Sequence, residues 1–427
     1  MSIPVLNSSS PRALTHSDAG RPPEGARWLT RGVLGIGLTS FLADAGHEIP
    51  TALLPGLLTS TLGAPAAALG LIEGLADGAA GVARFTGGAL ADDPDRRRVV
   101  AVGGYVSTAI LAALVGITVA VWQAAVLRMT AWVSRGLRVP ARDALLADLV
   151  PASVYGRAYG FERAMDNFGA IVGPALALVL VTLVGTRIAI VLSVIPGLLA
   201  GATIVYAIRQ TTQSTVRKRQ PVRVRVRPLL KGQLGRLILG VVAFELGHVA
   251  ATLLILRATQ IFEPGLGHEE ATQVALALYI GYNVAATVAS VPAGRLGDTW
   301  GAPVVLAGGI GCFFLGYLGF ALSGPSLVIV GLSFLVAGVA IGSVETAQHA
   351  AVATLAPPDL RGSAFGLLAG VQAFANLAAS GIAGLLWTLV DARVAFLYLA
   401  AWMLLALGGL AAAEIARQHV ASSLGSR

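Results

Sequence analysis

The stretch Gly88-Ala-Leu-Ala-Asp92 occurs a second time, slightly altered, as Gly294-Arg-Leu-Gly-Asp298. The two copies lie 206 residues apart, and the same offset relates a second group of positions. These are Pro151, Gly156, Ala158 and Gly160, which return as Pro357, Gly362, Ala364 and Gly366. A repeat of about half the chain, built from membrane-length apolar segments, predicts two similar helical bundles that rock about a shared central site.

The composition is that of a membrane protein and excludes a soluble enzyme. Hydrophobic residues make up 56% of the chain and charged residues 12%, and the mean hydropathy is +0.76. Soluble domains carry about 25% charged residues. The 52 glycines suit helices that pack closely in lipid. The single cysteine, Cys312, leaves no disulfide framework and no cysteine-based metal site.

Twelve segments are apolar and long enough to cross a bilayer, which takes roughly 20 residues. They lie near 28–58, 66–92, 98–119, 121–149, 155–184, 187–209, 235–261, 271–298, 302–322, 326–355, 361–389 and 392–416. We therefore expect an all-α membrane protein of two pseudo-symmetric six-helix bundles, at 28–209 and 235–417. A basic linker at 210–234 joins them, with tails at 1–27 and 418–427. The first tail lacks the apolar core of a signal peptide.

Arginine placement predicts the orientation of the chain. Basic residues concentrate at 96–98, at Arg157 and in the linker, whereas the alternate loops are nearly free of them. Both termini and the linker are therefore expected in the cytoplasm, and the protein in the cytoplasmic (inner) membrane. We assign the excess of basic over acidic residues, 30 to 22, to topology and contact with anionic lipid, and expect no nucleic-acid partner.

Ionisable residues inside spans are costly, so they are the first candidates for function. Span 1 carries Asp44, His47 and Glu48 on one helical face, and span 2 carries Glu73 and Asp77 four residues apart. Two carboxylates that close in a medium of low dielectric constant favour a proton acceptor. We predict proton coupling at Asp44, Glu48, Glu73 and Asp77; the alternative is that they only pair with nearby arginines.

An arginine stripe runs along span 4 through Arg128, Arg135, Arg138 and Arg142. Such a stripe must face the protein interior or a water-filled cavity, where it offers bidentate sites for carboxylate or phosphate. We predict substrate binding by Arg128, Arg135 and Arg138, the alternative again being neutralisation by buried carboxylates. A structural ion network is expected nearer the cytoplasm, made of Arg142, Asp143, Glu162, Arg163 and Asp166.

Three histidines lie inside spans, each beside a carboxylate. The pairs are His47 with Asp44 and Glu48, His248 with Glu245, and His349 with Glu345. They could converge on a divalent metal or a metal chelate, or titrate as a pH-sensitive relay. Polar residues that could contact a ligand or hold helices together complete the predicted substrate site: Asn283, Gln372 and Asn376.

Signatures of soluble enzymes are weak in this chain. His47-Glu48 is not followed by a second histidine at the spacing of a metalloprotease, and no phosphate-binding Gly-Lys-Ser/Thr loop occurs. We therefore expect no enzyme, no cofactor and no direct use of ATP.

The motif around Gly88 and Asp92, followed by Arg96 and Arg97, resembles the loop between spans 2 and 3 of the major facilitator superfamily. Gly294 to Asp298 is its second copy. Asp93 stands where that family usually has a basic residue. Gly173 and Pro174 lie in a stretch similar to a motif of proton-driven exporters, such as drug:proton antiporters. The resemblance covers about residues 28–417 and implies gating roles for Gly88, Asp92, Arg96, Gly173, Pro174, Gly294 and Asp298.

This resemblance also implies that spans 1, 4, 7 and 10 line a central cavity, and these spans hold most of the buried charges. We expect a proton-coupled secondary transporter, working by alternating access, that exports a small organic molecule as a monomer. Its expected partners are the substrate, protons and the lipid bilayer. One alternative is a transporter of a transition metal or metal chelate; a minor one is a membrane-embedded enzyme or receptor on the same fold.

Overall fold

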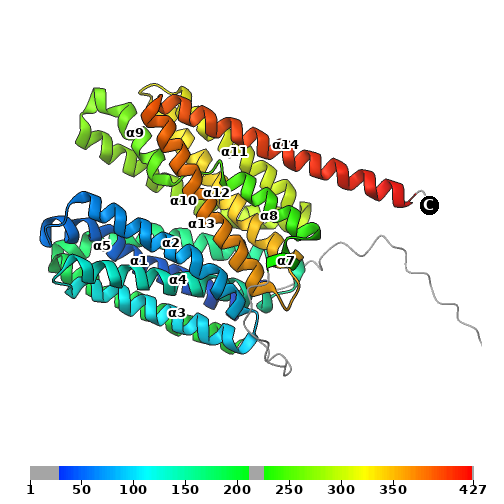
Figure 1. Cartoon of the computed structure of the whole chain (residues 1–427), viewed down its shortest axis with the longest axis horizontal. Helices are drawn as coiled ribbons and strands as arrows, with labels where there is room; N and C mark the ends of the chain where they lie inside the picture. The colour runs from blue at the N-terminus through cyan, green and yellow to red at the C-terminus, as the bar shows by residue number, and fades with distance from the viewer. Residues whose placement is uncertain (1–27, 211–225, 426–427) are drawn as a thin grey trace, which may run out of the picture.

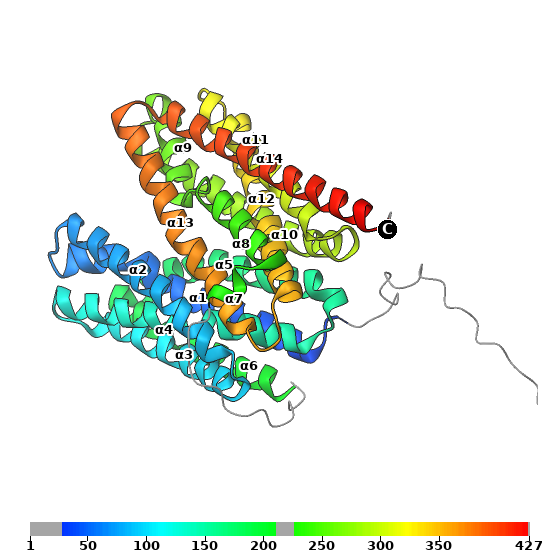
Figure 2. The same ribbon diagram turned by 45° about the vertical axis from the view of Figure 1, so that its right-hand side comes forward.

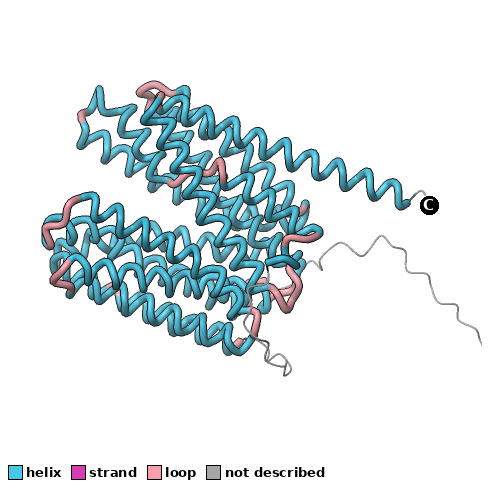
Figure 3. The backbone as a smooth tube through the Cα atoms, viewed as in Figure 1, coloured by secondary structure: helices cyan, strands magenta, loops and turns pink. Residues whose placement is uncertain are grey.

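The computed structural model describes residues 28–210 and 226–425, and at 66–67 and 412–425 the backbone alone. The predicted first tail and most of the predicted linker lie outside these ranges. Every regular element in the described residues is helical, and short loops join the helices (Figure 3). The expected all-α fold is confirmed.

The first bundle contains six long helices (Figure 1). They are α1 (Arg31–Gly56), α2 (Ala66–Ala91), α3 (Pro94–Leu114), α4 (Val121–Leu149), α5 (Tyr155–Leu192) and α6 (Val194–Arg209). Three short elements, η1 (Leu57–Thr61), η2 (Val115–Ile117) and η3 (Ala152–Val154), lie between them. The chain turns at Gly185, whose φ of 79° favours glycine, between the predicted fifth and sixth spans.

The second bundle follows the short α7 (Val226–Leu229). Its helices are α8 (Gly232–Glu245), α9 (Ala251–Leu266), α10 (His268–Trp300), α11 (Ala302–Leu322), α12 (Leu327–Leu355), α13 (Arg361–Leu389) and α14 (Ala392–Gly425). α14 continues to Gly425, beyond the predicted end of the last span near 416.

The predicted seventh span, near 235–261, is two helices instead of one. α8 ends at Glu245 and α9 begins at Ala251, so the chain is not helical around His248. Neighbouring helices satisfy the backbone groups that the break frees. The hydroxyl groups of Tyr317 and Ser380 accept from the amides of Val249 and Ala250, and Asn376 donates to the carbonyl of His248.

Seven helical stretches in the described residues are long and apolar enough to cross a membrane. One of them, Ala152–Arg209, contains both α5 and α6. α8 and α9 are too short to qualify separately, with 14 and 16 residues, and α2 and α4 carry charges on their interior faces. Large apolar side chains such as Leu183, Val328 and Leu389 are exposed on the outside, as a lipid-facing surface requires.

The two bundles meet at the end where α7 lies and diverge toward the opposite end (Figures 1 and 2). We call the first of these the linker end. Two helix pairs dominate the interface, α2 with α13 and α5 with α10. These pairs are equivalent under the 206-residue repeat.

Glycines bring these helices into backbone contact at the linker end. A Cβ added to Gly88 would lie 2.6 Å from the carbonyl oxygen of Gly362, and one on Gly366 would lie 2.5 Å from the carbonyl oxygen of Arg84. In the second pair, Gly294 lies against Gly156 in the same way. Larger residues at these positions would force the bundles apart.

At each of these two helix pairs, an aspartate of one bundle accepts hydrogen bonds from the other bundle. Asp92 accepts from the backbone N–H of Ser363 at 2.7 Å and from its hydroxyl at 2.5 Å. Asp298 accepts from the backbone N–H groups of Gly156 at 2.6 Å and Arg157 at 3.1 Å, and from Nε of Arg157 at 2.8 Å. Each carboxylate lies at the N-terminus of a helix, where the helix dipole favours negative charge. The two clasps are related by the repeat, since Arg157 and Ser363 are also 206 residues apart.

Candidate functional site: a charged central cavity

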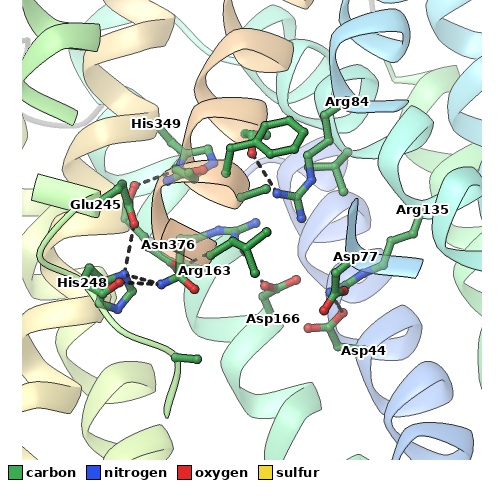
Figure 4. Close-up of a pocket in the computed structure, with 18 of the residues that line it drawn as sticks. Asp44, Asp77, Arg84, Arg135, Arg163, Asp166, Glu245, His248, His349 and Asn376 are labelled. Atoms are coloured by element: carbon green, nitrogen blue, oxygen red, sulfur yellow. Dashed lines mark hydrogen bonds and ion pairs between the residues drawn. The ribbon is translucent and has the colours of Figure 1, made fainter. Parts of the chain in front are cut away.

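A cavity of about 480 Å³ lies between the bundles. Its lining comes from α1, α2, α4 and α5 on one side and from the α8–α9 break, α12 and α13 on the other (Figure 4). The charged residues of this lining are Asp44, Asp77, Asp166, Glu245, Glu345, Arg84, Arg135, Arg138, Arg142 and Arg163, with His248 and His349 beside them. The lining therefore holds five carboxylates and five arginines.

Asp44 is the centre of the α1 wall. Its carboxylate lies 3.5 Å from Nη2 of Arg135 and 3.2 Å from Nδ1 of His47, and only 7% of the residue is exposed. His47 lies behind Asp44, where its Nε2 is 3.2 Å from Glu48. Of this predicted group, Asp44 lines the cavity, whereas His47 and Glu48 are outside its lining.

The predicted ion network of α4 and α5 forms as a dense cluster. Arg142 lies 2.9 Å from Glu162, 3.0 Å from Asp143 and 3.4 Å from Asp166. Arg163 lies 2.6 Å from Glu162 and 3.3 Å from Asp166. Part of this network faces the cavity, because Arg142, Arg163 and Asp166 belong to the cavity lining.

Glu73 and Asp77 do not form the close carboxylate pair that their spacing suggests, since each has its own partner on α4. Glu73 lies 2.9 Å from Nη2 of Arg128, and Asp77 accepts from Nε1 of Trp132 at 2.8 Å. The guanidinium of Arg128 lies 3.4 Å from the centre of the Trp132 ring. Glu73 and Arg128 are outside the cavity lining, and Asp77 is part of it.

On the second-bundle side, the break between α8 and α9 positions the predicted Glu245 and His248 pair. Nδ1 of His248 lies 3.0 Å from the Glu245 carboxylate. Asn376 holds this loop by donating to the carbonyl of His248 at 2.8 Å, and Gln372 donates to Gln348 at 2.7 Å. Glu245, His248, Gln372 and Asn376 all line the cavity.

The expected pairing of the His349 and Glu345 side chains does not occur. Nδ1 of His349 donates to the backbone carbonyl of Glu345 at 2.8 Å, and its Nε2 lies 3.7 Å from Asp143. The carboxylate of Glu345 points across the cavity toward Arg163, 3.8 Å away. A spacing of four along a helix allowed both arrangements, and the neighbouring bundle selects the second.

The three histidines do not converge. Within the described residues, no group of three or more histidine, cysteine, aspartate or glutamate side chains could hold a metal ion. His47 is outside the cavity lining, whereas His248 and His349 line its second-bundle side from two different elements, the α8–α9 break and α12. Asn283 also stays apart, because its amide donates to the carbonyl of Tyr279 one turn earlier and it is not in the lining.

Arg84 is a cavity residue that the sequence reasoning missed. It lies seven residues after Asp77, two helical turns along the same face of α2, so the spacing already placed it toward the interior. Its Nη1 donates to the backbone carbonyl of Ala369 on α13 at 2.8 Å (Figure 4). Its Nε is buried without a hydrogen-bond partner.

A family model described as Major Facilitator Superfamily matches residues 36–269 and 259–423. The chain belongs to the major facilitator superfamily. An uncharacterized MFS-type transporter of Methanocaldococcus jannaschii is 30% identical over 392 residues, covering 91% of this chain and 96% of that protein. An uncharacterized protein of Mycobacterium tuberculosis is 32% identical over 183 residues, which cover 43% of this chain and 44% of that protein.

Solved structures of the superfamily share the fold at low sequence identity. The human organic anion transporter MFSD10 (TETRAN) gives a TM-score of 0.69 at 18% identity, covering 91% of this chain and 100% of that one. A bacterial homologue of the iron transporter ferroportin, in an outward-facing state, gives a TM-score of 0.70 at 18% identity. The match covers 89% of this chain and 98% of that one. The proton:xylose symporter XylE gives a TM-score of 0.64 at 17% identity, and the match covers 88% of this chain and 94% of that one. The protein is thus a multi-pass membrane transporter of this superfamily.

Proposed function

We propose that this protein is a proton-coupled secondary active transporter that exports a small organic molecule across the cytoplasmic membrane, with Asp44 carrying the proton. The observation that supports this proposal is the position of Asp44. It is a buried carboxylate, it lines the central cavity, and its charge is balanced by Arg135 across 3.5 Å.

Such a carboxylate can exist in two states inside the membrane. When ionised, it is stabilised by Arg135 and His47; when protonated, it no longer carries the charge that desolvation penalises. A substrate group that is cationic or donates hydrogen bonds would bind the ionised form. Proton and substrate would then compete for Asp44, and this competition exchanges one for the other.

The proposed direction of transport follows from exchange against protons that enter from outside. The linker end is the end that the arginine distribution assigns to the cytoplasm, so the cavity of this form opens to the outside. A proton entering from outside would neutralise Asp44 and release the substrate outward. In the opposite form, loss of the proton to the cytoplasm would restore the site for the next substrate molecule.

The test uses proteoliposomes that contain a pH-sensitive dye. Organic cations, zwitterions and anions are added one at a time, and a compound that is exchanged for protons changes the internal pH. We expect Asp44→Asn to abolish this response while the protein stays folded and monodisperse. The matched control is Glu263→Gln, which removes a carboxylate on α9 that is outside the cavity lining. An undiminished proton response in Asp44→Asn would reject the assignment.

A further inference from the structure

We infer that Arg84 is the binding site for an anionic group of the substrate, a carboxylate or a phosphate. This inference rests on the proposed function only in taking the central cavity as the substrate site. It concerns the chemistry of the substrate and makes no use of proton coupling.

Arg84 differs from three of the other four arginines of the cavity in having no ion-pair partner among the described residues. Arg135, Arg142 and Arg163 each lie within 3.5 Å of a carboxylate. Among the described residues, no carboxylate lies within the 4.0 Å limit of an ion pair from Arg84. A cation that is partly removed from water without a nearby counter-charge carries a desolvation cost, and an anionic ligand would lower that cost.

Arg138 is the other arginine of the cavity lining without an ion pair among the described residues, but its surroundings explain its charge. Its guanidinium lies 3.8 Å from the centre of the Tyr105 ring on α3, so it is held against an aromatic face. Only 3% of Arg138 is exposed. Arg84 has no such aromatic partner among the described residues, and its side chain is only partly buried at the cavity wall.

The hydrogen bonds of Arg84 leave unused the guanidinium edge that could bind an anion. Nη1 is occupied by the carbonyl of Ala369, which fixes the plane of the guanidinium. Nε is buried and has no hydrogen-bond partner, so the edge formed by Nε and Nη2 holds an unused donor. Carboxylate and phosphate bind arginine through two parallel N–H···O bonds along such an edge.

The cavity also offers a negative charge some distance away from Arg84. Asp77 lines the cavity seven residues before Arg84, about 10 Å away along the axis of α2. Its hydrogen-bond partner is the indole of Trp132, which is uncharged. A substrate with an anionic group on Arg84 can therefore extend a cationic or donor group toward Asp77 and Asp44.

Binding to the purified full-length protein tests this inference. The anionic probes are acetate, benzoate, inorganic phosphate and glucose 6-phosphate, and benzamide and glucose are the uncharged counterparts of two of them. Thermal stabilisation and calorimetry measure the dissociation constants at constant ionic strength. We expect at least one anionic probe to bind, its uncharged counterpart to bind at least tenfold more weakly, and Arg84→Gln to weaken the anion at least tenfold.

Two further variants keep the test decisive. Arg84→Lys retains the charge but not the two-pronged edge, so it should also weaken binding even if Arg84→Gln fails to fold. Arg295→Gln removes an exposed arginine of α10 and should leave binding unchanged. The inference is overturned if no anionic probe binds the unmodified protein, or if anions bind both Arg84 variants normally.

The outcomes separate this inference from the proposed function. Asp44→Asn should keep anion binding, because Asp44 is not the anion site. If Asp44→Asn retains proton exchange while Arg84→Gln loses anion binding, the proton assignment fails and the anion site stands. If Asp44→Asn loses proton exchange while Arg84→Gln keeps anion binding, only the assignment of Arg84 as the anion site is rejected.

Discussion

The two bundles of this transporter share a scaffold but not their chemistry. The glycines and aspartates that close the linker end occur in both halves at an offset of 206 residues, and they make equivalent contacts. The charges of the cavity are not repeated in this way. At the same offset, Asp77 is replaced by Asn283, Arg142 by Gln348 and Asp166 by Gln372.

This difference separates two demands on the molecule. Alternating access needs both halves to close symmetrically, so the gate residues are duplicated. A binding site needs one asymmetric arrangement, and here most of its charges come from the first bundle. The following predictions test how far this division holds.

The largest effect is expected at the glycine contacts. Gly88→Val and Gly294→Val should each prevent closure at the linker end, because a side chain there meets the backbone of the opposite bundle. Spin labels at Val99→Cys on α3 and Trp300→Cys on α10, in a Cys312→Ala background, would report a longer distance by pulsed electron resonance. Gly103→Val is the control, since nothing lies within 4 Å of a Cβ there. An unchanged distance in either variant would contradict a gate shared by both halves.

The next effect should appear where a charge of the first bundle is compared with its neutral equivalent. Arg142→Gln leaves Asp143 buried without its arginine and Glu162 with Arg163 alone, so it should lower the free energy of unfolding by about 3–5 kcal/mol. Gln348→Ala removes one hydrogen bond to Gln372 and should cost about 1 kcal/mol. Denaturant unfolding in detergent measures both. Equal losses would mean that the second bundle depends on its polar core as strongly as the first.

A smaller and symmetric effect is expected at the two clasps. Asp92→Asn should expose the amide of Ser363, and Asp298→Asn the amides of Gly156 and Arg157. Each should exchange hydrogen about tenfold faster, equivalent to about 1.4 kcal/mol of local stability. Mass spectrometry of the peptides around 156 and 363 measures this. A change at only one of the two sites would show that the gate is not symmetric.

The smallest effect should come from Asn283. Its amide makes one hydrogen bond within its own helix, so Asn283→Ala should cost about 0.5–1 kcal/mol. Asp77→Ala should cost more, because it leaves the N–H of Trp132 without its acceptor. The two melting temperatures in one detergent give the comparison, and a larger loss from Asn283→Ala would contradict the assignment of Asn283 to a local role.

The fold and much of the cavity followed from the sequence because both depend on patterns that the chain shows directly. Membrane-length apolar segments gave the helices, and the 206-residue repeat gave the division into two similar bundles. Charges inside spans had to face the interior, and the family resemblance implied that spans 1, 4 and 7 line the cavity, so Asp44, Arg135 and Glu245 were expected there.

Tertiary contacts decided the remainder. The break around His248 depends on Tyr317, Ser380 and Asn376, which lie far away in the sequence. The orientation of Glu345 depends on Arg163 of the other bundle. Arg84 could have been found from its spacing to Asp77, but its lack of a counter-charge is visible only when all neighbouring helices are placed.

The balance of charges in the cavity has a consequence for the electrical behaviour of the transporter. Five arginines and five carboxylates line it, so with neutral histidines the empty cavity carries no net charge. A membrane potential acts on a conformational change in proportion to the charge that moves, at about 2.3 kcal/mol per elementary charge per 100 mV. The lining residues should therefore add little voltage dependence to the reorientation of the empty carrier, whereas a bound proton or charged substrate should add its own charge to the current.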